Sequence, residues 1–240
     1  MKDTRKDSPG KHCVFIAGAT GYMGGALIPR LIKSGHLIRA LARPGSERKL
    51  PAGCTVVTGN ALDEATFAAQ VAPADTYVHL VGVAHPSPWK AEQFRAIDLR
   101  SFQASLAAAQ GAKIKHFVYA SVAHPAPMMK DYIAVRQECE SLLRQSGLAA
   151  TVLRPWYVLG PGHLWPYVLL PLYALCERLS ATRAGALRLG MVTLADMAGA
   201  LYEAIEGFPM NANGGEPARE MNILEVPAIR AAGARQRHSA

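Results

Sequence analysis

A glycine-rich turn between a strand-like run and a helix-like run restricts the fold of this chain more than any other feature. The apolar residues 12–17 lead directly into residues 18–24 (GATGYMG), and a helix-like run, residues 26–32, follows at once. Glycines at this spacing let the backbone turn sharply and approach another group closely. Free N–H groups and the dipole at a helix N-terminus stabilise negative charge. This context predicts a turn that binds the pyrophosphate of a dinucleotide, rather than a turn that uses glycine for its shape alone.

Six residues of this turn are predicted to contact the dinucleotide: Gly18, Thr20, Gly21, Tyr22, Met23 and Gly24.

The rest of the chain continues the alternation of strand-length apolar runs and longer helical patterns. Such alternation is typical of successive βαβ units and a parallel sheet. We predict strands at residues 12–17, 37–42, 54–58, 76–81, 116–120 and 151–153. We predict helices at residues 22–34, 64–71, 91–110 and 129–146. The predicted fold class is α/β, a Rossmann doubly wound parallel sheet with a small C-terminal substrate-side cap.

A single domain fits the length of 240 residues. We predict that it covers residues 12–226, with the cap mainly in residues 155–226 and a cap helix that begins near Thr193 and Asp196. Residues 1–11 are charged and lack the apolar stretch of a signal peptide, so a flexible arm is expected there. The Ala- and Arg-rich residues 227–240 are expected to form a loose tail.

The formal net charge is +8, and the basic residues are scattered along the chain. No basic stripe is interleaved with aromatic residues, so nucleic acid is not an expected partner. The charge favours anionic ligands or peripheral contact with an anionic membrane. The four cysteines do not have the close spacing of a zinc or redox motif. We therefore expect no metal site and a cytoplasmic protein, with the inner face of a membrane as an alternative location.

The most apolar window, residues 164–176, contains two prolines and is too short to span a bilayer. Its simplest interpretation is a cap segment that buries itself against the domain. Two alternatives remain open: a pocket for a hydrophobic small-molecule substrate, or an apolar surface that meets a membrane or a partner.

A basic residue stands where the choice between the two nicotinamide cofactors is made. Arg43 directly follows the second predicted strand, about twenty residues beyond the glycine turn, where an NAD-selective protein carries an acidic side chain for the ribose hydroxyls. A guanidinium group matches the oxygens of the 2′-phosphate of NADP. NADP(H) is therefore favoured over NAD(H), and a solvated surface arginine is the alternative.

Several motifs together resemble the atypical and extended short-chain dehydrogenase/reductases. They are GATGYMG at 18–24, TGNALD at 58–63, YVHLVG at 77–82, FVYAS at 117–121, the segment 132–136 and LRPWYVLGPG at 153–162. Their order and spacing are similar to that family over residues 12 to about 207. The closest likeness is to the branch that includes NmrA-like cofactor sensors and the accessory dehydrogenase-like subunit of respiratory complex I.

This resemblance implies roles for further residues. Asn60 and Ala61 stand where the family contacts adenine. Leu80, Val81 and Gly82 would line the strand on the nicotinamide side. The segment from Pro155 to Val158 would cover the nicotinamide, and Ser121 would support the site from the end of a strand.

The resemblance also implies a catalytic pair, in altered form. The family uses a tyrosine as proton donor or acceptor, a lysine four residues later and a serine or threonine. Here Tyr132 is present, Arg136 replaces the lysine, and Val122 stands at the serine position. Residues four apart share a helix face, so Arg136 can lie beside Tyr132. Arginine keeps the charge but cannot deprotonate, and its planar fork differs from an ammonium group.

Two functions follow as hypotheses. The first is an NADP(H)-dependent oxidoreductase or epimerase-like enzyme that acts on a carbonyl or hydroxyl group. The second is a non-catalytic NAD(P)(H)-binding sensor or accessory protein. Either function could be combined with contact to a membrane or a respiratory complex.

Overall fold

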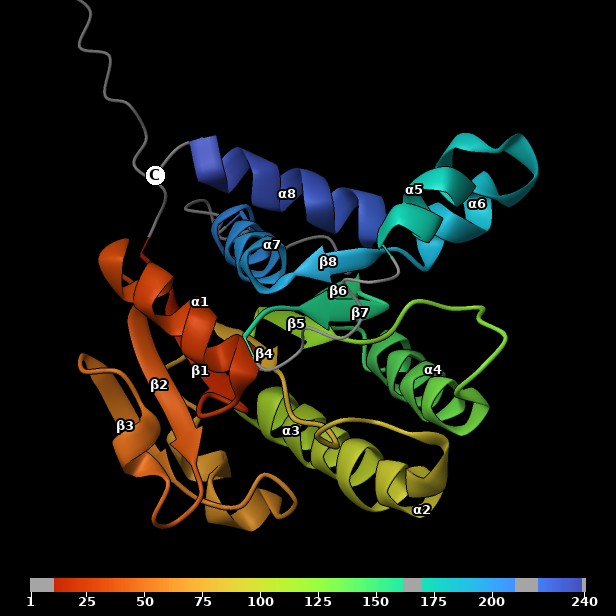
Figure 1. The fold of residues 1–240 in the computed structure, drawn as a ribbon. Helices are drawn as coiled ribbons and strands as arrows, with labels where there is room; N and C mark the ends of the chain where they lie inside the picture. Colours follow the sequence, from red (N-terminus) through yellow and green to blue (C-terminus); the bar gives the residue numbers. More distant parts are fainter. Residues whose placement is uncertain (1–10, 162–169, 210–219, 239–240) are drawn as a thin grey trace, which may run out of the picture.

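The computed structural model describes residues 11–161, 170–209 and 220–238 of the chain. At its centre lies a parallel sheet of seven strands in the order β3-β2-β1-β4-β5-β6-β9 (Figure 1). These strands are β1 (Cys13–Ala17), β2 (Leu37–Ala42), β3 (Cys54–Thr58), β4 (Thr76–His79), β5 (His116–Ala120), β6 (Ala149–Arg154) and β9 (Met221–Glu225). The strand order reverses between β1 and β4. In such sheets ligands bind at the carboxyl ends of the strands beside this point.

Helices cover both faces of the sheet (Figure 1). On one face lie α1 (Tyr22–Lys33) and α7 (Leu194–Glu206), and α8 (Val226–His238) packs on α7. On the other face lie α3 (Arg100–Gly111) and α4 (Lys130–Gln145). Successive strand side chains point to opposite faces. Accordingly, Val14 of β1 joins the core beneath α1, and Phe15 joins the core beneath α3.

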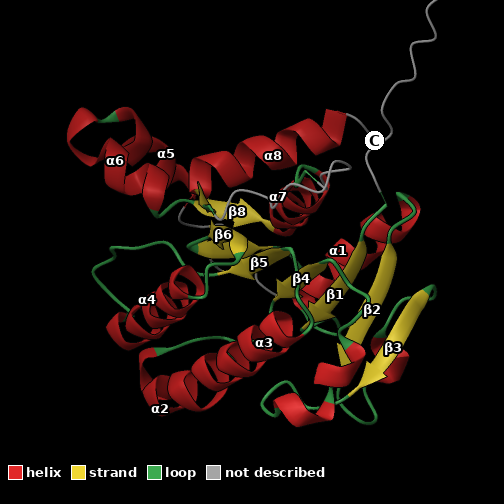
Figure 2. Cartoon of the chain, turned by 180° about the vertical axis from the view of Figure 1, so that it is seen from behind, coloured by secondary structure: helices red, strands yellow, loops and turns green. Residues whose placement is uncertain are grey.

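Figure 2 also shows the remaining described elements, which lie outside the seven-stranded sheet and its main helices. A two-stranded parallel sheet pairs β7 (Tyr157–Leu159) with β8 (Met191–Thr193). Two helices, α5 (Leu170–Arg178) and α6 (Ser180–Arg188), pack against each other. Before α3 come α2 (Ala91–Gln93) and a π-helical turn at Phe94–Leu99. There are 3-10 turns at Glu47–Lys49, Glu64–Thr66, Ala68–Gln70 and Pro88–Lys90.

The predicted α/β fold is confirmed, and all six predicted strands are present, with the bounds of β2, β3 and β5 as predicted. The helix predicted at residues 64–71 is wrong, because two 3-10 turns replace it. The hydroxyl of Thr66 donates to the carbonyl of Asp63, and the carboxylate of Asp63 accepts from the N–H of Ala65. Such local bonds offer the backbone an alternative to the α-helix. The helix predicted at residues 91–110 is interrupted by the π-helical turn.

The loose tail predicted for residues 227–240 is also wrong over its described part, which forms α8 and packs along α7. Two ion pairs join the helices, Arg237–Asp196 at 2.5 Å and Arg235–Glu203 at 2.6 Å. Asp196 also completes a capping box with Thr193 at the start of α7, where a helix was predicted to begin. The alanines of this segment have a high helix propensity. Packing against α7 then stabilises α8 as a helix.

The close approach of α7 and α8 depends on glycine. A Cβ added at Gly233 would overlap the backbone of Asp196, and one added at Gly199 would lie 3.0 Å from the Cα of Gly233. We expect Gly233→Ala to lower the free energy of unfolding by about 1–3 kcal/mol, because the helices must separate. Urea denaturation measures this change.

The matched control is Gly185→Ala in α6, where nothing lies within 4 Å of the added Cβ. It should raise the free energy of unfolding by roughly 0.5–1 kcal/mol, as expected for alanine in a helix. Equal stabilisation by both substitutions would contradict the packing described for α7 and α8.

Candidate functional site

The turn after β1 is packed directly against the end of β4. Gly18 has a φ of +86°, and a Cβ there would lie 2.8 Å from the carbonyl carbon of Leu80. A Cβ at Gly24 would lie 2.5 Å from the carbonyl oxygen of Ala19. Both positions therefore require glycine.

The start of α1 is suited to an anion. Gly21 is its N-cap, no side chain caps it, and its first turn contains no acidic residue. The N–H of Gly21 donates to the carbonyl of Gly18 at 3.0 Å, which closes the turn. The positive end of the helix therefore faces the carboxyl edge of the sheet without a charged neighbour in its first turn. These residues fit the pyrophosphate of a dinucleotide.

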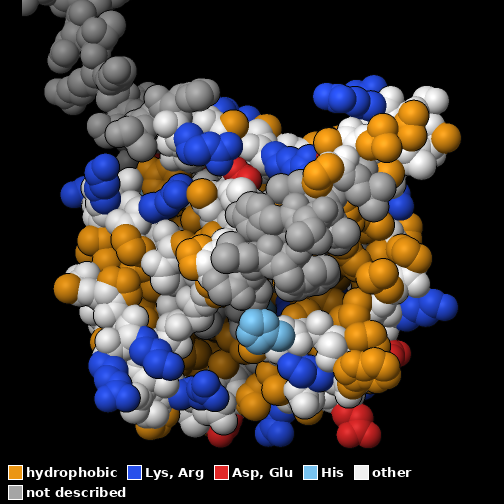
Figure 3. Space-filling model, in the orientation of Figure 1, with side chains coloured by type: hydrophobic (Ala, Val, Ile, Leu, Met, Phe, Trp, Pro, Cys, Tyr) orange, Lys and Arg blue, Asp and Glu red, His pale blue; other side chains and the backbone are white. Residues whose placement is uncertain are grey.

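The ends of β2 and β3 form the neighbouring part of this edge. The N–H of Gly59 donates to the carbonyl of Ala42 at 2.9 Å, which brings Arg43 and Asn60 onto adjacent strand ends. The side-chain oxygen of Asn60 accepts from the N–H of Leu62, so it is used within its own loop. Arg43 is exposed, and its guanidinium makes no hydrogen bond or ion pair with any other described residue. Lys and Arg side chains gather over this region in Figure 3.

Ala61, the other predicted adenine contact, is partly buried and packs against the core beneath α3.

On the other side of the switch point, Arg136 is buried against the segment that follows β4. Its side chain is 6% exposed and forms an ion pair of 2.5 Å with Asp98. Its Nη1 donates to the hydroxyl of Tyr119 at 3.1 Å and to the carbonyl of Ala120 at 3.0 Å. A Cβ at Gly82 would overlap Nη2 of Arg136 and lie 3.1 Å from Oδ1 of Asp98. The guanidinium therefore occupies the space that a side chain at position 82 would need.

The predicted pair Tyr132 and Arg136 lies together on α4. The guanidinium carbon of Arg136 is 5.0 Å from the ring centroid of Tyr132, and the ring centroid of Phe94 also lies 5.0 Å from that of Tyr132. Burial raises the pKa of Tyr132, although Arg136 lowers it in part. The phenol is therefore protonated at neutral pH and can donate a proton.

Ser121 belongs to a buried hydrogen-bond network rather than to the surroundings of Tyr132. Its hydroxyl donates to Glu140 at 2.6 Å, and the same carboxylate is paired with Arg154 at 2.5 Å. His124 lies near this network, with its Nε2 3.6 Å from Glu140. Val122 is buried and offers no hydroxyl group. Tyr132 and Tyr119 are thus the two phenols beside Arg136.

The segment after β6 lies close to the start of α1. The carbonyl of Pro155 accepts from the N–H of Ala123 at 2.9 Å, and Val158 pairs with Val192 in the small sheet. A Cβ at Gly160 would overlap the hydroxyl of Tyr22. Gly160, two residues beyond the segment predicted to cover the nicotinamide, thus lies beside Tyr22 of the glycine turn.

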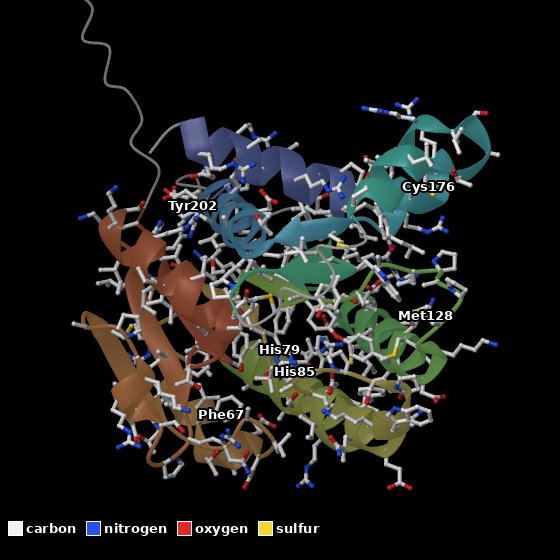
Figure 4. The ribbon with its side chains drawn as sticks, viewed as in Figure 1. Phe67, His79, His85, Met128, Cys176 and Tyr202 are labelled. Atoms are coloured by element: carbon white, nitrogen blue, oxygen red, sulfur yellow. The ribbon has the colours of Figure 1, made fainter. Side chains whose placement is uncertain are left out.

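Near the centre of Figure 4, where β4 ends, are His79 and the exposed His85. His79 is fully buried, and burial lowers its pKa to about 3, so it is neutral. Met128, which lies two residues before the start of α4, is labelled in the same view.

Sequence reasoning missed Asp98. The signal was present, because Phe94, Asp98 and Phe102 recur at helical spacing and the two aromatics are apolar core residues. A carboxylate on such a face requires a partner, since burying an unpaired charge is very costly.

The apolar window at residues 164–176 is only partly within the described residues. Its first part, residues 164–169, lies outside them, and the remainder belongs to α5. Among the helices that the structure describes, none combines the length and apolar character needed to cross a membrane.

A parallel sheet with a glycine turn and an uncapped helix start at its switch point defines a Rossmann dinucleotide-binding protein. A family described as NAD(P)H-binding matches residues 18–163. The chain belongs to this family. The fold expected from the resemblance to atypical short-chain dehydrogenase/reductases is confirmed, because solved structures of a short-chain dehydrogenase/reductase superfamily protein and of a UDP-glucose 4-epimerase share it.

Two curated relatives are named as reductases. The chain is 28% identical over 156 residues to a ceramide reductase of Caulobacter vibrioides, covering 62% of this chain and 47% of the relative. It is 26% identical over 168 residues to a 4-hydroxy-2-methyl-3-oxo-4-farnesyl-3,4-dihydroquinoline-1-oxide ketoreductase of Stigmatella aurantiaca, covering 61% and 50%. The chain thus matches about half the length of these relatives.

Solved structures share the fold at lower identity. A putative epimerase from Burkholderia cenocepacia has a TM-score of 0.64 and 23% identity, covering 95% of this chain and 81% of that one. The Bordetella bronchiseptica enzyme WbmH, solved with NAD+, has a TM-score of 0.61 and 19% identity, covering 88% and 84%.

The contact between Gly82 and Arg136 provides a test of the site geometry. We expect Gly82→Ala to displace the guanidinium, to lower the free energy of unfolding by about 1–3 kcal/mol and to weaken the binding of NAD(P)H. Gly111→Ala at the end of α3 is the control, because nothing lies within 4 Å of its added Cβ. Thermal unfolding and calorimetric titration measure both effects. Wild-type affinity and stability in Gly82→Ala would show that Arg136 lies elsewhere.

Proposed function

We propose that this protein is an NADP(H)-dependent oxidoreductase that reduces the carbonyl group of an apolar substrate, with Tyr132 as the proton donor. One observation carries the proposal. Gly18 lies against Leu80, and two residues further on Gly82 lies against Arg136. The phosphate-binding turn and the Tyr132–Arg136 pair therefore flank the same short segment after β4. A dinucleotide with its pyrophosphate at the turn could extend along this segment toward Tyr132.

The preference for NADP(H) rests on Arg43. Its exposed guanidinium follows β2, beside the loop of Asn60, on the adenine side of the glycine turn. No acidic side chain occupies the strand end where one would bind the ribose hydroxyls. Arginine binds phosphate through parallel N–H donors, so a 2′-phosphate is the group that this position best accommodates.

The chemistry of the proposed reaction needs one hydride and one proton. The reduced nicotinamide supplies the hydride when it is bound. The Tyr132 hydroxyl donates its proton to the substrate's carbonyl oxygen while the carbonyl carbon accepts the hydride, and the product is a hydroxyl group. The resulting phenolate regains a proton from water. Tyr132 carries its proton at neutral pH, as a proton donor in reduction must.

Exposed apolar residues support an apolar substrate. Trp89, in the loop after β4, is 91% exposed, and Met128, in the loop after β5, is 59% exposed. The 3-10 turn that holds Trp89 contacts α4, which begins just after Met128. Both relatives named above act, by their names, on a ceramide or a farnesyl-bearing quinoline. A substrate with a long apolar group is consistent with these observations.

The alternative is a protein that binds NADP(H) without turnover, as a sensor or accessory subunit. It is favoured by Val122 at the serine position and by the pairing of Arg136 with Asp98. In both cases the net charge of +8 would favour association with an anionic membrane. Turnover that depends on Tyr132 separates the two functions.

Cofactor choice is tested by calorimetric titration with NADPH and with NADH. We expect NADPH to bind more tightly, and Arg43→Glu to weaken NADPH binding by roughly 10- to 100-fold, the loss of about 1.5–3 kcal/mol from a charged hydrogen bond. The affinity for NADH should change much less. Lys33→Glu, the same charge reversal at the other end of α1, is the control. An equal effect on both cofactors would contradict the assignment of Arg43.

Catalysis is tested with ketones that bear long apolar chains. Tyr132→Phe should lower kcat by about 10²–10⁴-fold and leave NADPH binding intact, because it removes only the proton donor. Tyr202→Phe on α7, at the opposite edge of the sheet, is the control. The wild-type rate of reduction should stay level through neutral pH and fall only as the pH rises through the raised pKa of Tyr132. Equal turnover in Tyr132→Phe would favour the non-catalytic alternative.

A further inference from the structure

A buried carboxylate joins three elements around the candidate proton donor. Asp98 lies in the π-helical turn before α3, and its side chain has no solvent exposure. Its Oδ1 accepts from Arg136 on α4 at 2.5 Å, and its Oδ2 accepts from the N–H of Val83 after β4 at 3.0 Å. Irregular π-helical turns are frequent at functional sites. Asp98 therefore fixes Arg136 and the segment after β4 with one group.

The guanidinium held by Asp98 is directed at two phenols. Its carbon lies 5.0 Å from the ring centroid of Tyr132 and 5.7 Å from that of Tyr119. Nη1 and Nη2 are used by Tyr119, Ala120 and Asp98, whereas Nε is buried and has no partner among the described residues. An unpartnered buried donor at this place could serve an acceptor on a bound molecule.

The charges that face Tyr132 are those of Arg136 and Asp98. Burial raises the pKa of Asp98, but Arg136 opposes this shift most strongly, and we assign the pair as ionised. The other titratable groups around it are neutral near pH 7. Burial lowers the pKa of His79 on β4 to about 3, raises that of Cys139 on α4 to about 11, and raises that of Tyr119 on β5.

These two charges act on Tyr132 in opposite directions. Burial is the largest influence and raises the pKa of Tyr132; Arg136 lowers it, and Asp98 raises it. A fixed cation alone would favour the phenolate, which is the form that accepts a proton. With Asp98 beside the cation, much of this influence is cancelled.

We infer that Asp98 is a positioning residue that holds Arg136 and offsets its charge at Tyr132, so that Tyr132 keeps its proton and acts as a donor in reduction. Asp98 and Arg136 function as one unit in place of a single free cation. The inference rests on the proposed function in assigning the proton transfer to Tyr132. Its electrostatic part concerns the protein alone and can be measured without cofactor or substrate.

The test is an ultraviolet titration of the Tyr132 phenol in the cofactor-free protein. Ionisation is followed by rapid mixing to high pH, so that it is recorded before unfolding, and the Tyr132→Phe version of each protein is subtracted. In Asp98→Asn, which keeps the shape and an acceptor for Arg136, the Tyr132 midpoint should shift to lower pH. An unchanged or higher midpoint overturns the inference.

A second variant covers the case in which Asp98→Asn does not fold, since it leaves Arg136 without its charge partner. Asp98→Asn/Arg136→Met removes both charges, so that neither partner is left as an unpaired buried charge, which is the strongly destabilising case. Because Asp98 cancels much of the influence of Arg136 on Tyr132, the midpoint of this double variant should lie close to that of the wild type. A midpoint clearly above that of the wild type would show that the charge of Arg136 was not offset, and this result also overturns the inference.

Glu138→Gln is the matched control. It removes a carboxylate charge from α4 at an ion pair with Arg95 whose side chains are 63% and 41% exposed. The Tyr132 midpoint should not change in this variant. A shift as large as that in Asp98→Asn would show that any nearby carboxylate has the same effect, which counts against a special role for Asp98.

The proposed function is tested separately, by measuring the binding of NADPH to the same proteins. If NADPH does not bind the wild type, the proposed function fails while a shifted midpoint in Asp98→Asn still supports the electrostatic role of Asp98. If NADPH binds and the midpoint does not move, the inference fails and the cofactor assignment stands. With an active substrate, Asp98→Asn should also move the falling limb of the reduction rate to lower pH.

Discussion

The backbone of Gly18 lies against the backbone of Leu80, and the functional part of the molecule depends on this contact. It brings the turn after β1 onto the end of β4, at the point where the strand order of the sheet reverses. Any side chain at Gly18 would separate the two strand ends. The contact aligns the uncapped start of α1 with the segment that leads from Leu80 to Arg136, so one edge of the sheet presents both a site for negative charge and a proton-carrying phenol.

The second constraint is electrostatic. A guanidinium group at Arg136 is too costly to bury alone, and Asp98 from another helix satisfies it. The pair also excludes any side chain from position 82 and holds the loop after β4 through Val83. Arg136 is thus held in a local environment that includes the carboxylate of Asp98, and in the proposed reaction this carboxylate offsets the charge of Arg136 at Tyr132.

Sequence alone predicted the parts of the fold that depend on local rules. The glycines of the turn follow from steric demands within a few residues, and the proximity of Tyr132 and Arg136 follows from helical spacing. Asp98 was not predicted because its partner comes from another helix. The helix α8 was mistaken for a loose tail, because its stability comes from close packing of Gly233 on α7 rather than from its own composition. The absence of a helix at residues 64–71 reflects the competing bonds of Thr66 and Asp63.

The most direct test of this account is backbone hydrogen–deuterium exchange of the protein with and without saturating NADPH. If a dinucleotide binds along the edge from the glycine turn to the segment after β4, exchange should slow in residues 18–25 and 80–83, with a smaller change near residues 43 and 60. Slower exchange confined to other segments, or no change at saturating NADPH, would contradict the central claim that this edge is the cofactor site.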